Sequence, residues 1–179
     1  DLLILARADA GERPIVRERL YLDDLTLEAA GAARAVAQAK GVALDVDEFD
    51  EAPVVGDPTL LRQLVMILLD NAVKFTERGG RVRVRVGAPN DRALLVVEDT
   101  GVGITTEQLP HVFERFYRGD AARSRANGNG ADGAGLGLSI AKWIADAHQA
   151  EIALTSAPGK GTHVTVRFGF REQPSVPLA

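Results

Sequence analysis

The stretch LLVVEDTGVGI, residues 94–104, joins an apolar strand pattern to a turn that contains two glycines. Leu94 to Val97 form a continuous apolar run, which is typical of a central strand. Asp99 would then lie at the end of that strand, as a hydrogen-bond acceptor on the floor of a pocket. Gly101 and Gly103 carry no Cβ, so the backbone could approach a flat ligand closely. The alternative is a turn in which Asp and Gly only satisfy local geometry.

The composition predicts one globular domain. The chain has 179 residues, of which 46% are hydrophobic and 26% charged, so a core can form. A formal net charge of −4 gives no reason to expect nucleic-acid binding through bulk charge. The absence of Cys excludes a disulfide framework, and no apolar run reaches the roughly 18 residues of a membrane span. The chain opens with DLLIL, without Met or a signal-peptide pattern, so we expect a fragment of a longer protein.

Turn signals and periodicity divide the rest of the chain into short elements. Asp57-Pro58 places a carboxylate cap before a proline, which predicts a helix that continues to about Phe75. Arg81 to Val86 alternate Arg and Val, which predicts a half-buried strand. Residues 119–133 contain no large apolar side chain and are expected to form a long mobile loop. Further helices are expected at about 23–40 and 136–148, and further strands at 42–46, 151–155 and 162–170.

Asn71 and Lys74 are three residues apart on the predicted helix and therefore share one face. An amide oxygen can ligate a hard cation and an ammonium group can contact phosphate oxygens, so the pair suits a metal-bound polyphosphate. The alternative is a polar pair on a solvated helix face.

Two segments on either side of the polar loop complete the set of unusual patterns. FERFYR, residues 113–118, concentrates three aromatic residues and two arginines in a chain that is only 5% aromatic. We expect the aromatic rings on one buried face of a helical turn. Arg115 and Arg118 would face phosphate or a carboxylate, unless the segment is a satellite core with solvated arginines. GAGLGLS, residues 133–139, opens a helix whose free N–H groups could bind an anion, or is a flexible joint.

Two other features of the sequence, a glycine pattern and the three histidines, are not expected to mark a functional site. GNGADG, residues 128–133, fits G-x-G-x-x-G but follows a polar loop instead of a strand, and the chain contains no P-loop. His111, His148 and His163 are dispersed without metal-ligand spacing, so we expect them to be structural or exposed.

Taken together, these segments resemble the catalytic and ATP-binding domain of sensor histidine kinases. Its superfamily includes gyrase-type topoisomerases, a heat-shock chaperone and mismatch-repair ATPases. The resemblance covers about residues 15–170 and implies an α/β two-layer sandwich, in which a mixed β-sheet is covered on one face by three helices, with a long ATP lid. The matching segments are an N-box at 70–76, glycine boxes at 99–103 and 133–138, an F-box at 113–118 and a third glycine element at 159–162.

The resemblance also implies domain boundaries. Residues 1–14 would be the end of a dimerisation helix and a linker. Residues 15–171 would be the catalytic ATP-binding domain, and residues 172–179 a C-terminal tail.

Roles for single residues follow from the same resemblance. Asp99 would accept a hydrogen bond from the adenine amino group, Asn71 would ligate Mg²⁺ and Lys74 would contact the phosphates. Arg115 or Arg118 would stabilise the transferring γ-phosphate, so Asn71, Lys74 and these arginines form the expected catalytic set. Contacts with ATP are expected from Asn71, Lys74, Asp99, Gly101, Gly103, Tyr117, Gly133, Gly135, Leu136, Gly137, Leu138 and Thr162.

Two positions depart from the family pattern. The kinases usually have a second Asn four residues before Asn71, and the gyrase-like ATPases have a water-activating Glu there, whereas this chain has Ile67. Ala134 stands where the kinases often have Thr. Three functions therefore stay open: a histidine kinase fragment, a degenerate kinase acting as a nucleotide-binding interaction module, and a gyrase- or chaperone-like ATPase. Ile67 argues most against the ATPase.

The phosphoacceptor is expected outside this chain. None of its three His is followed by an acidic residue, as the family's acceptor usually is. The resemblance implies an acceptor on a dimerisation domain of the same protein, a homodimeric parent, and a response regulator receiver domain as the next partner. It also implies a cytoplasmic domain, without nucleic-acid or membrane contacts of its own, in a parent that could be an integral membrane sensor.

Overall fold

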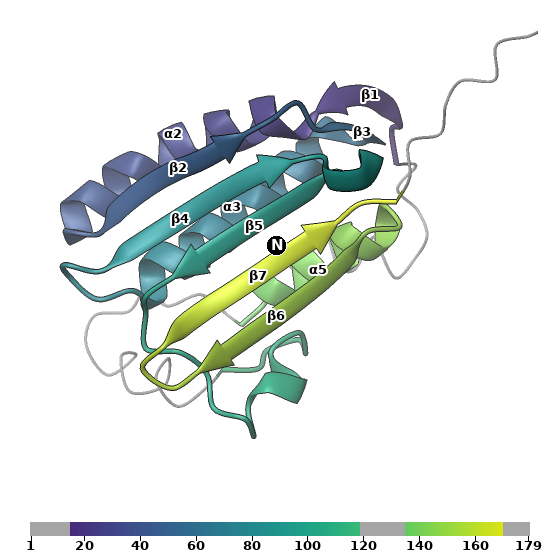
Figure 1. Cartoon of the computed structure of the whole chain (residues 1–179). Helices are drawn as coiled ribbons and strands as arrows, with labels where there is room; N and C mark the ends of the chain where they lie inside the picture. The colour runs from purple at the N-terminus through teal and green to yellow at the C-terminus, as the bar shows by residue number, and fades with distance from the viewer. Residues whose placement is uncertain (1–14, 119–134, 170–179) are drawn as a thin grey trace, which may run out of the picture.

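A mixed five-stranded sheet organises the computed structural model, which describes residues 15–118 and 135–169. The strand order is β2-β4-β5-β7-β6, with β2 and β4 parallel and the other neighbours antiparallel (Figure 1). The strands are β2 (Ala43–Phe49), β4 (Arg81–Gly87), β5 (Leu94–Asp99), β6 (Glu151–Ala157) and β7 (Gly161–Arg167). The predicted central strand is confirmed, because Leu95, Val96 and Val97 of β5 are all buried.

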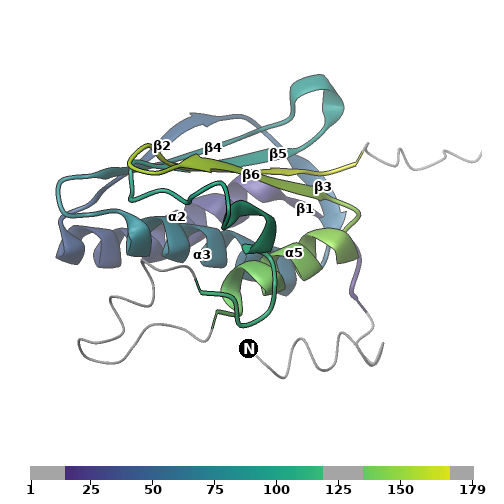
Figure 2. The same cartoon turned by 90° about the horizontal axis from the view of Figure 1, so that it is seen from below.

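Three helices cover one face of this sheet, as the resemblance predicts. They are α2 (Leu22–Lys40), α3 (Pro58–Phe75) and α5 (Gly137–Ala147), and they form a separate layer when the sheet is seen edge-on (Figure 2). The core lies between the layers, where fully buried leucines of α3 meet the valines of β4 and β5. None of the helices in the described ranges is long and apolar enough to cross a membrane.

Helix α3 begins where its sequence predicts. The Asp57 carboxylate accepts hydrogen bonds from the backbone N–H groups of Thr59 and Leu60, at 2.9 and 3.1 Å. Pro58 occupies the first turn, where its missing N–H costs no hydrogen bond. The backbone N–H of Asp57 donates to Nε2 of His148, which lies after α5, at 3.0 Å. This buried contact joins the start of α3 to the end of α5.

A small second sheet is absent from the sequence prediction. It pairs β1 (Glu18–Tyr21) with β3 (Pro53–Gly56) in antiparallel register. Each strand has only four residues, and their pairing spans a whole helix and strand, so no local periodicity indicates it. The described residues also include two short 3₁₀ helices, η1 (Pro89–Asp91) and η2 (Leu109–His111).

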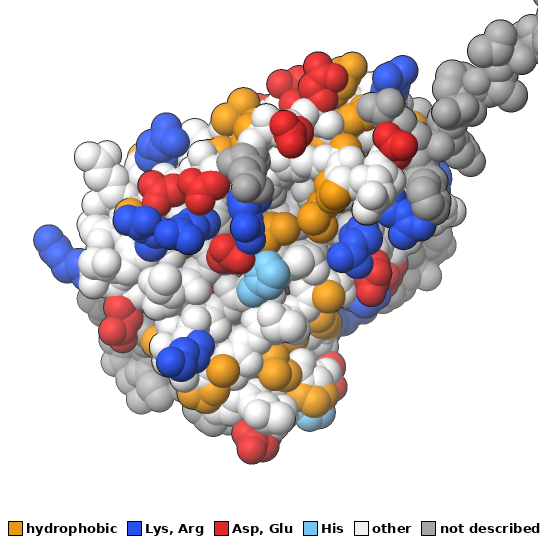
Figure 3. All heavy atoms as spheres, in the orientation of Figure 1, with side chains coloured by type: hydrophobic (Ala, Val, Ile, Leu, Met, Phe, Trp, Pro, Cys, Tyr) orange, Lys and Arg blue, Asp and Glu red, His pale blue; other side chains and the backbone are white. Residues whose placement is uncertain are grey.

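The other face of the sheet is open and carries ion pairs. On β4 the valines face the helices and the arginines face outward, which confirms the predicted half-buried strand. Basic and acidic side chains intermingle on this face in the space-filling view (Figure 3). The pairs and their N–O distances are Arg81–Asp45 (3.3 Å), Arg83–Asp47 (3.8 Å), Arg85–Glu98 (2.7 Å) and Arg167–Glu151 (3.4 Å).

Several predictions fall outside the described residues. They are the end of a dimerisation helix and linker at 1–14, the loop at 119–133 with Gly133, the Ala134 departure and the C-terminal tail at 172–179. The predicted last strand, 162–170, instead ends at Arg167.

Candidate functional site

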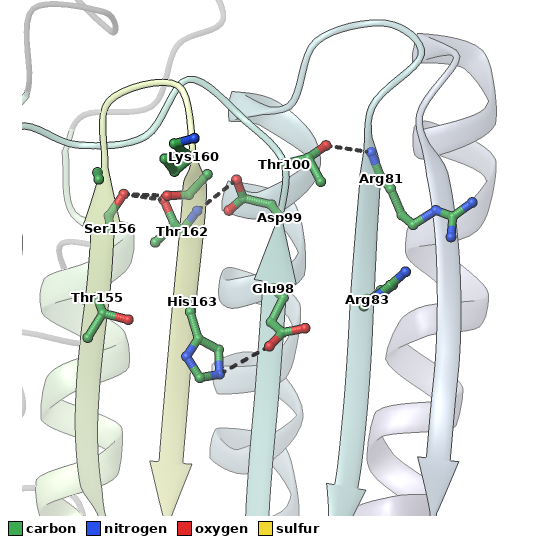
Figure 4. Close-up of a pocket in the computed structure, with 12 residues that line it drawn as sticks. Arg81, Arg83, Glu98, Asp99, Thr100, Thr155, Ser156, Lys160, Thr162 and His163 are labelled. Atoms are coloured by element: carbon green, nitrogen blue, oxygen red, sulfur yellow. Dashed lines mark hydrogen bonds and ion pairs between the residues drawn. The ribbon is translucent and has the colours of Figure 1, made fainter.

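Asp99 is held at the end of β5 by two backbone donors. Its Oδ1 accepts from the N–H of Gly101 at 2.8 Å and from the N–H of Thr162 at 3.2 Å. Thr162 is the register partner of Asp99 on β7, so the antiparallel pairing brings both predicted residues together (Figure 4). Because side chains alternate along a strand, Asp99 shares the helix-facing side with Leu95 and Val97.

The two glycines of the turn allow close packing against other backbone segments. A Cβ on Gly101 would lie 2.4 Å from the carbonyl oxygen of Phe75, at the end of α3. A Cβ on Gly103, whose φ is +72°, would lie 1.9 Å from the carbonyl oxygen of Ala157. The turn is therefore pressed between α3 and the β6–β7 connection. These contacts supply a structural reason for both glycines, in addition to the ligand approach considered above.

The environment of Asp99 disfavours its charged form. Burial raises the pKa of the Asp99 carboxyl above its usual value, and the hydrogen bonds from Gly101 and Thr162 offset part of that rise. Both hydrogen bonds use Oδ1, and no donor reaches Oδ2 from within residues 15–118 and 135–169. A second carboxylate oxygen is thus available to a ligand donor.

Asn71 on α3 lies beside the start of α5. Its Nδ2 and the Cγ2 of Ile67 are each 3.5 Å from the position that a Cβ on Gly137 would occupy. The fold thus brings the N-box and the second glycine box together, and Ile67 lies at the same contact. Lys74 follows on α3, and its Nζ is 5.5 Å from the centroid of the Phe75 ring.

Helix α5 begins without a side-chain cap. Leu136 at its N-cap position is buried and offers no hydrogen-bond acceptor, so the side chain leaves the first N–H groups of the helix uncapped. Gly137 and the half-buried Leu138 follow in the first turn. An uncapped helix start of this kind favours a bound anion.

The F-box differs from its prediction. Phe113 is partly buried against the core, but 60% of Phe116 is exposed and its φ is +63°, so the expected single buried aromatic face is wrong. The segment turns sharply because the N–H of Phe116 donates to the carbonyl oxygen of Gly135 at 3.0 Å. Gly135 in turn lies against the backbone of Tyr117. Tertiary pairing with the second glycine box thus overrides the helical turn.

The two arginines of the F-box lie beyond η2. Arg115 is exposed and Arg118 is half-buried. Both interact with other groups of the protein.

The three histidines have structural or exposed positions, as expected. His148 is buried and its Nδ1 lies 2.7 Å from the carbonyl oxygen of Ile144. Nδ1 of His111 pairs with Glu114 at 2.7 Å, and Nε2 of His163 lies 3.4 Å from Oε1 of Glu98 on the open face (Figure 4). Within the described ranges, no three His, Cys, Asp or Glu side chains form a metal site.

Ser156 on β6 links the glycine turn to the β6–β7 connection, and no sequence pattern predicted this role. Its hydroxyl donates to the carbonyl oxygen of Gly161 at 2.6 Å and accepts from the N–H of Ile104 at 2.9 Å. It also lies 3.1 Å from the hydroxyl of Thr162. A lone Ser in a strand gives no sequence signal for such contacts, which depend on the tertiary position of the glycine turn.

A cleft of about 530 Å³ opens on the uncovered side of the sheet. Arg81, Arg83 and His163 contribute to its lining, and it reaches Asp99 and Thr162 at the strand ends (Figure 4). The expected ATP site lies on the helix side of the sheet, so the cleft shares only the strand ends at Asp99 and Thr162 with the expected contacts.

Comparison with known proteins identifies the family. The family model described as "Histidine kinase-, DNA gyrase B-, and HSP90-like ATPase" matches residues 56–172. The sensor histidine kinase YkoH of Bacillus subtilis (strain 168) is 42% identical over 173 residues, which are 93% of this chain but only 35% of YkoH.

Solved structures agree with this assignment. The mycobacterial sensor histidine kinase MprB aligns with a TM-score of 0.72 and 27% identity over 84% of this chain and 97% of that chain. Full-length ShkA in complex with AMPPNP aligns with a TM-score of 0.78 and 25% identity over 97% of this chain and 35% of that chain. The expected resemblance and two-layer fold are thereby confirmed. The chain belongs to the family of histidine kinase-, DNA gyrase B- and HSP90-like ATPases.

Proposed function

We propose that this chain is the ATP-binding catalytic domain of a sensor histidine kinase, which transfers the γ-phosphate of ATP to a histidine on a separate domain. The observation that carries the proposal is the Asp99 carboxylate, whose Oδ1 is held by two backbone N–H groups while Oδ2 meets no donor from the part of the chain that the structure describes. A fixed acceptor at a strand end, in a chain of this ATPase family, suits the exocyclic amine of adenine. Thr162 supplies one of the two backbone donors and would border the base.

The other end of the nucleotide would lie between α3 and α5. The uncapped N–H groups at the start of α5, near Gly135, Gly137 and Leu138, would hold phosphate oxygens. Lys74 would add a positive charge, and Arg115 or Arg118 would stabilise the γ-phosphate during transfer. Phosphoryl transfer depends mainly on positioning and charge stabilisation, which these groups can provide without a covalent intermediate.

Asn71 would serve as a protein ligand of Mg²⁺. This cation usually retains waters and substrate phosphate oxygens and takes only one or two protein ligands. One amide oxygen from Asn71, beside Gly137 of α5, suits that mode, and the neighbouring Ile67 offers no second ligand. When bound, the ion would neutralise phosphate charge.

The experiment that tests the proposal compares two consecutive residues of β5. Asp99→Asn should weaken ATP binding by about a hundredfold or more, because an amide in place of Oδ2 presents a donor to the adenine amine. Glu98→Gln is the matched control, since its side chain points to the open face, and it should leave the affinity within about twofold. Isothermal titration calorimetry measures both. Near-normal binding by Asp99→Asn would contradict the adenine role.

A second experiment separates a kinase from the two alternatives that Ile67 leaves open. Ile67→Asn should leave ATP affinity similar but increase phosphate transfer to the missing His-containing domain supplied in trans, because it restores a second amide beside Asn71. Phosphohistidine formation from labelled ATP is the readout. If no phosphohistidine forms with either protein, the chain is a nucleotide-binding module, and steady-state phosphate release without an acceptor would indicate an ATPase.

The parent protein is part of the same proposal, because the chain spans 35% of YkoH. We expect a dimerisation domain bearing the acceptor histidine, a homodimeric assembly and a response regulator receiver domain as partner. We also expect this domain to lie in the cytoplasm.

A further inference from the structure

Each of the last four carbonyl groups of α3 accepts a hydrogen bond from a residue beyond the bounds of that helix. Such carbonyls lack intrahelical partners and need other donors. The carbonyl oxygen of Ala72 accepts from the backbone N–H and the hydroxyl of Thr76, at 3.1 and 2.7 Å. The carbonyl oxygen of Phe75 accepts from the N–H of Val102 at 3.2 Å. The two carbonyls between them depend on a residue from a different helix.

Lys40 supplies those two hydrogen bonds. It is the last residue of α2, and its half-buried ammonium donates to the carbonyl oxygens of Val73, at 2.8 Å, and Lys74. A cation at a helix C-terminus also interacts favourably with the helix dipole. The ammonium therefore binds the final turn of α3 through both hydrogen bonding and charge.

Backbone hydrogen bonds hold the end of α2 against the α3–β4 connection, so the backbone of Lys40 is fixed in position. The N–H of Gly79 donates to the carbonyl oxygen of Gly41 at 2.7 Å, and the N–H of Ala43 donates to that of Gly80 at 3.0 Å. These contacts join the α2–β2 connection to the α3–β4 connection on either side of the lysine. The hydrogen bonds from Lys40 of α2 therefore help to fix the C-terminal end of α3, in addition to the hydrogen bonds within α3 itself.

That terminus carries both halves of the proposed ATP site. Its last turns hold Asn71 and Lys74, and the carbonyl of Phe75 receives the glycine turn through Val102. Gly101 packs so closely on the same carbonyl that a Cβ there would lie 2.4 Å from its oxygen. A shift of this turn of α3 would move the phosphate-binding residues and the Asp99 turn together.

We infer that Lys40 is a positioning residue that aligns the phosphate-binding end of α3 with the adenine-binding turn. The nucleotide part of the inference rests on the proposed function. Lys40 lies before residue 56, where the family match begins, so the match itself assigns it nothing. A purely structural lysine would instead lower stability without changing ligand affinity.

The test removes the ammonium but keeps the length of the side chain. Lys40→Met should accelerate amide hydrogen exchange at Val102 by about tenfold or more in the ligand-free protein, relative to the buried strand amide of Val97. The reason is that the final turn of α3 loses both hydrogen bonds from Lys40, and this turn ends at the Phe75 carbonyl that accepts from Val102. The same variant should weaken MgATP binding by about tenfold, measured by calorimetry at a temperature where it is fully folded. Lys40→Arg should return both values towards those of the unchanged chain, since a guanidinium also donates to carbonyls.

The matched control is Thr26→Val, which removes a buried hydrogen bond of 2.7 Å to Leu22 within the same helix, away from the site. It should lower stability but leave Val102 exchange and MgATP affinity unchanged. Unchanged Val102 exchange in Lys40→Met would overturn the inference, as would faster exchange with normal MgATP affinity. If the unchanged chain binds no ATP, the proposed function fails, while the exchange experiment still decides whether Lys40 holds the glycine turn.

Discussion

Strand β5 has one face against the helices and one on the open side of the sheet, where only Glu98 is polar, and the two faces contribute differently to the protein. On the helix side Leu95 and Val97 are almost fully buried, and Asp99 follows at the strand end. On the open side Glu98 contacts Arg85 and His163, all of them partly exposed. One strand therefore supplies core packing on one face and, through Glu98, partly exposed ion pairs on the other.

The difference shows where a buried charge is tolerated. Asp99 lies on the helix side, yet two backbone N–H groups stabilise its carboxylate. Its raised pKa indicates that these donors do not fully replace water. That residual cost is consistent with the binding role proposed for Asp99, whose Oδ2 meets no donor from residues 15–118 and 135–169.

The largest expected effect on stability comes from the apolar face. Leu95→Ala should lower the free energy of unfolding by about 2–5 kcal/mol, because it leaves a cavity between β5 and α3. Arg85→Met, which breaks the exposed pair with Glu98, should cost less than about 1 kcal/mol. Urea denaturation of both variants gives the comparison. Equal losses would show that the open-face pairs contribute more than their exposure suggests.

The second effect concerns buried His148 and half-buried His163. Burial lowers the pKa of His148 below its usual 6.5, so the unfolded chain takes up the proton first as the pH falls. The stability that neutral His148 provides is complete above about pH 6.5 and is lost as the pH falls towards the lowered pKa. The His148→Gln variant should be less stable than the unchanged chain at about pH 8. It should also lose less stability than the unchanged chain on acidification to about pH 5.5.

His163→Gln is the comparison on the open face. This variant should lose as much stability on acidification as the unchanged chain, because the contact between His148 and the N–H of Asp57 is unchanged. Thermal melts across this pH range measure the three proteins. Identical slopes for His148→Gln and the unchanged chain would exclude His148 as the responsible group.

The smallest effect is expected from salt. The open-face pairs are partly exposed, so raising the ionic strength from about 0.02 to 0.5 M should weaken them by only a few tenths of a kcal/mol in total. Arg81→Gln should reduce this salt dependence, because it removes the pair with Asp45. Denaturation midpoints at both salt concentrations test it, and a large loss of stability would mean that the open face is a major stabilising element.

Local signals in the sequence predicted most of the fold. The Asp57-Pro58 signal located the start of α3, and the alternation of Arg81 to Val86 predicted a strand with one buried face, because both depend on neighbouring residues. The β1–β3 sheet was not predicted, since its two short strands pair across the whole of α2 and β2. Phe116 was placed wrongly because its hydrogen bond to Gly135 joins residues that are distant in the chain.

For the candidate site, the sequence by itself determined which chemical groups are available. Asp99, Asn71, Lys74 and the glycines could be selected because their side chains, or the lack of one, limit the ligands they suit. Only the tertiary structure decided that Thr162 would hold Asp99 and that Lys40 would hold the end of α3. The physical reason is that each contact joins backbone groups left unpaired at the end of one element to a donor or acceptor on another. Such pairings are set by how the elements pack, which local sequence does not specify.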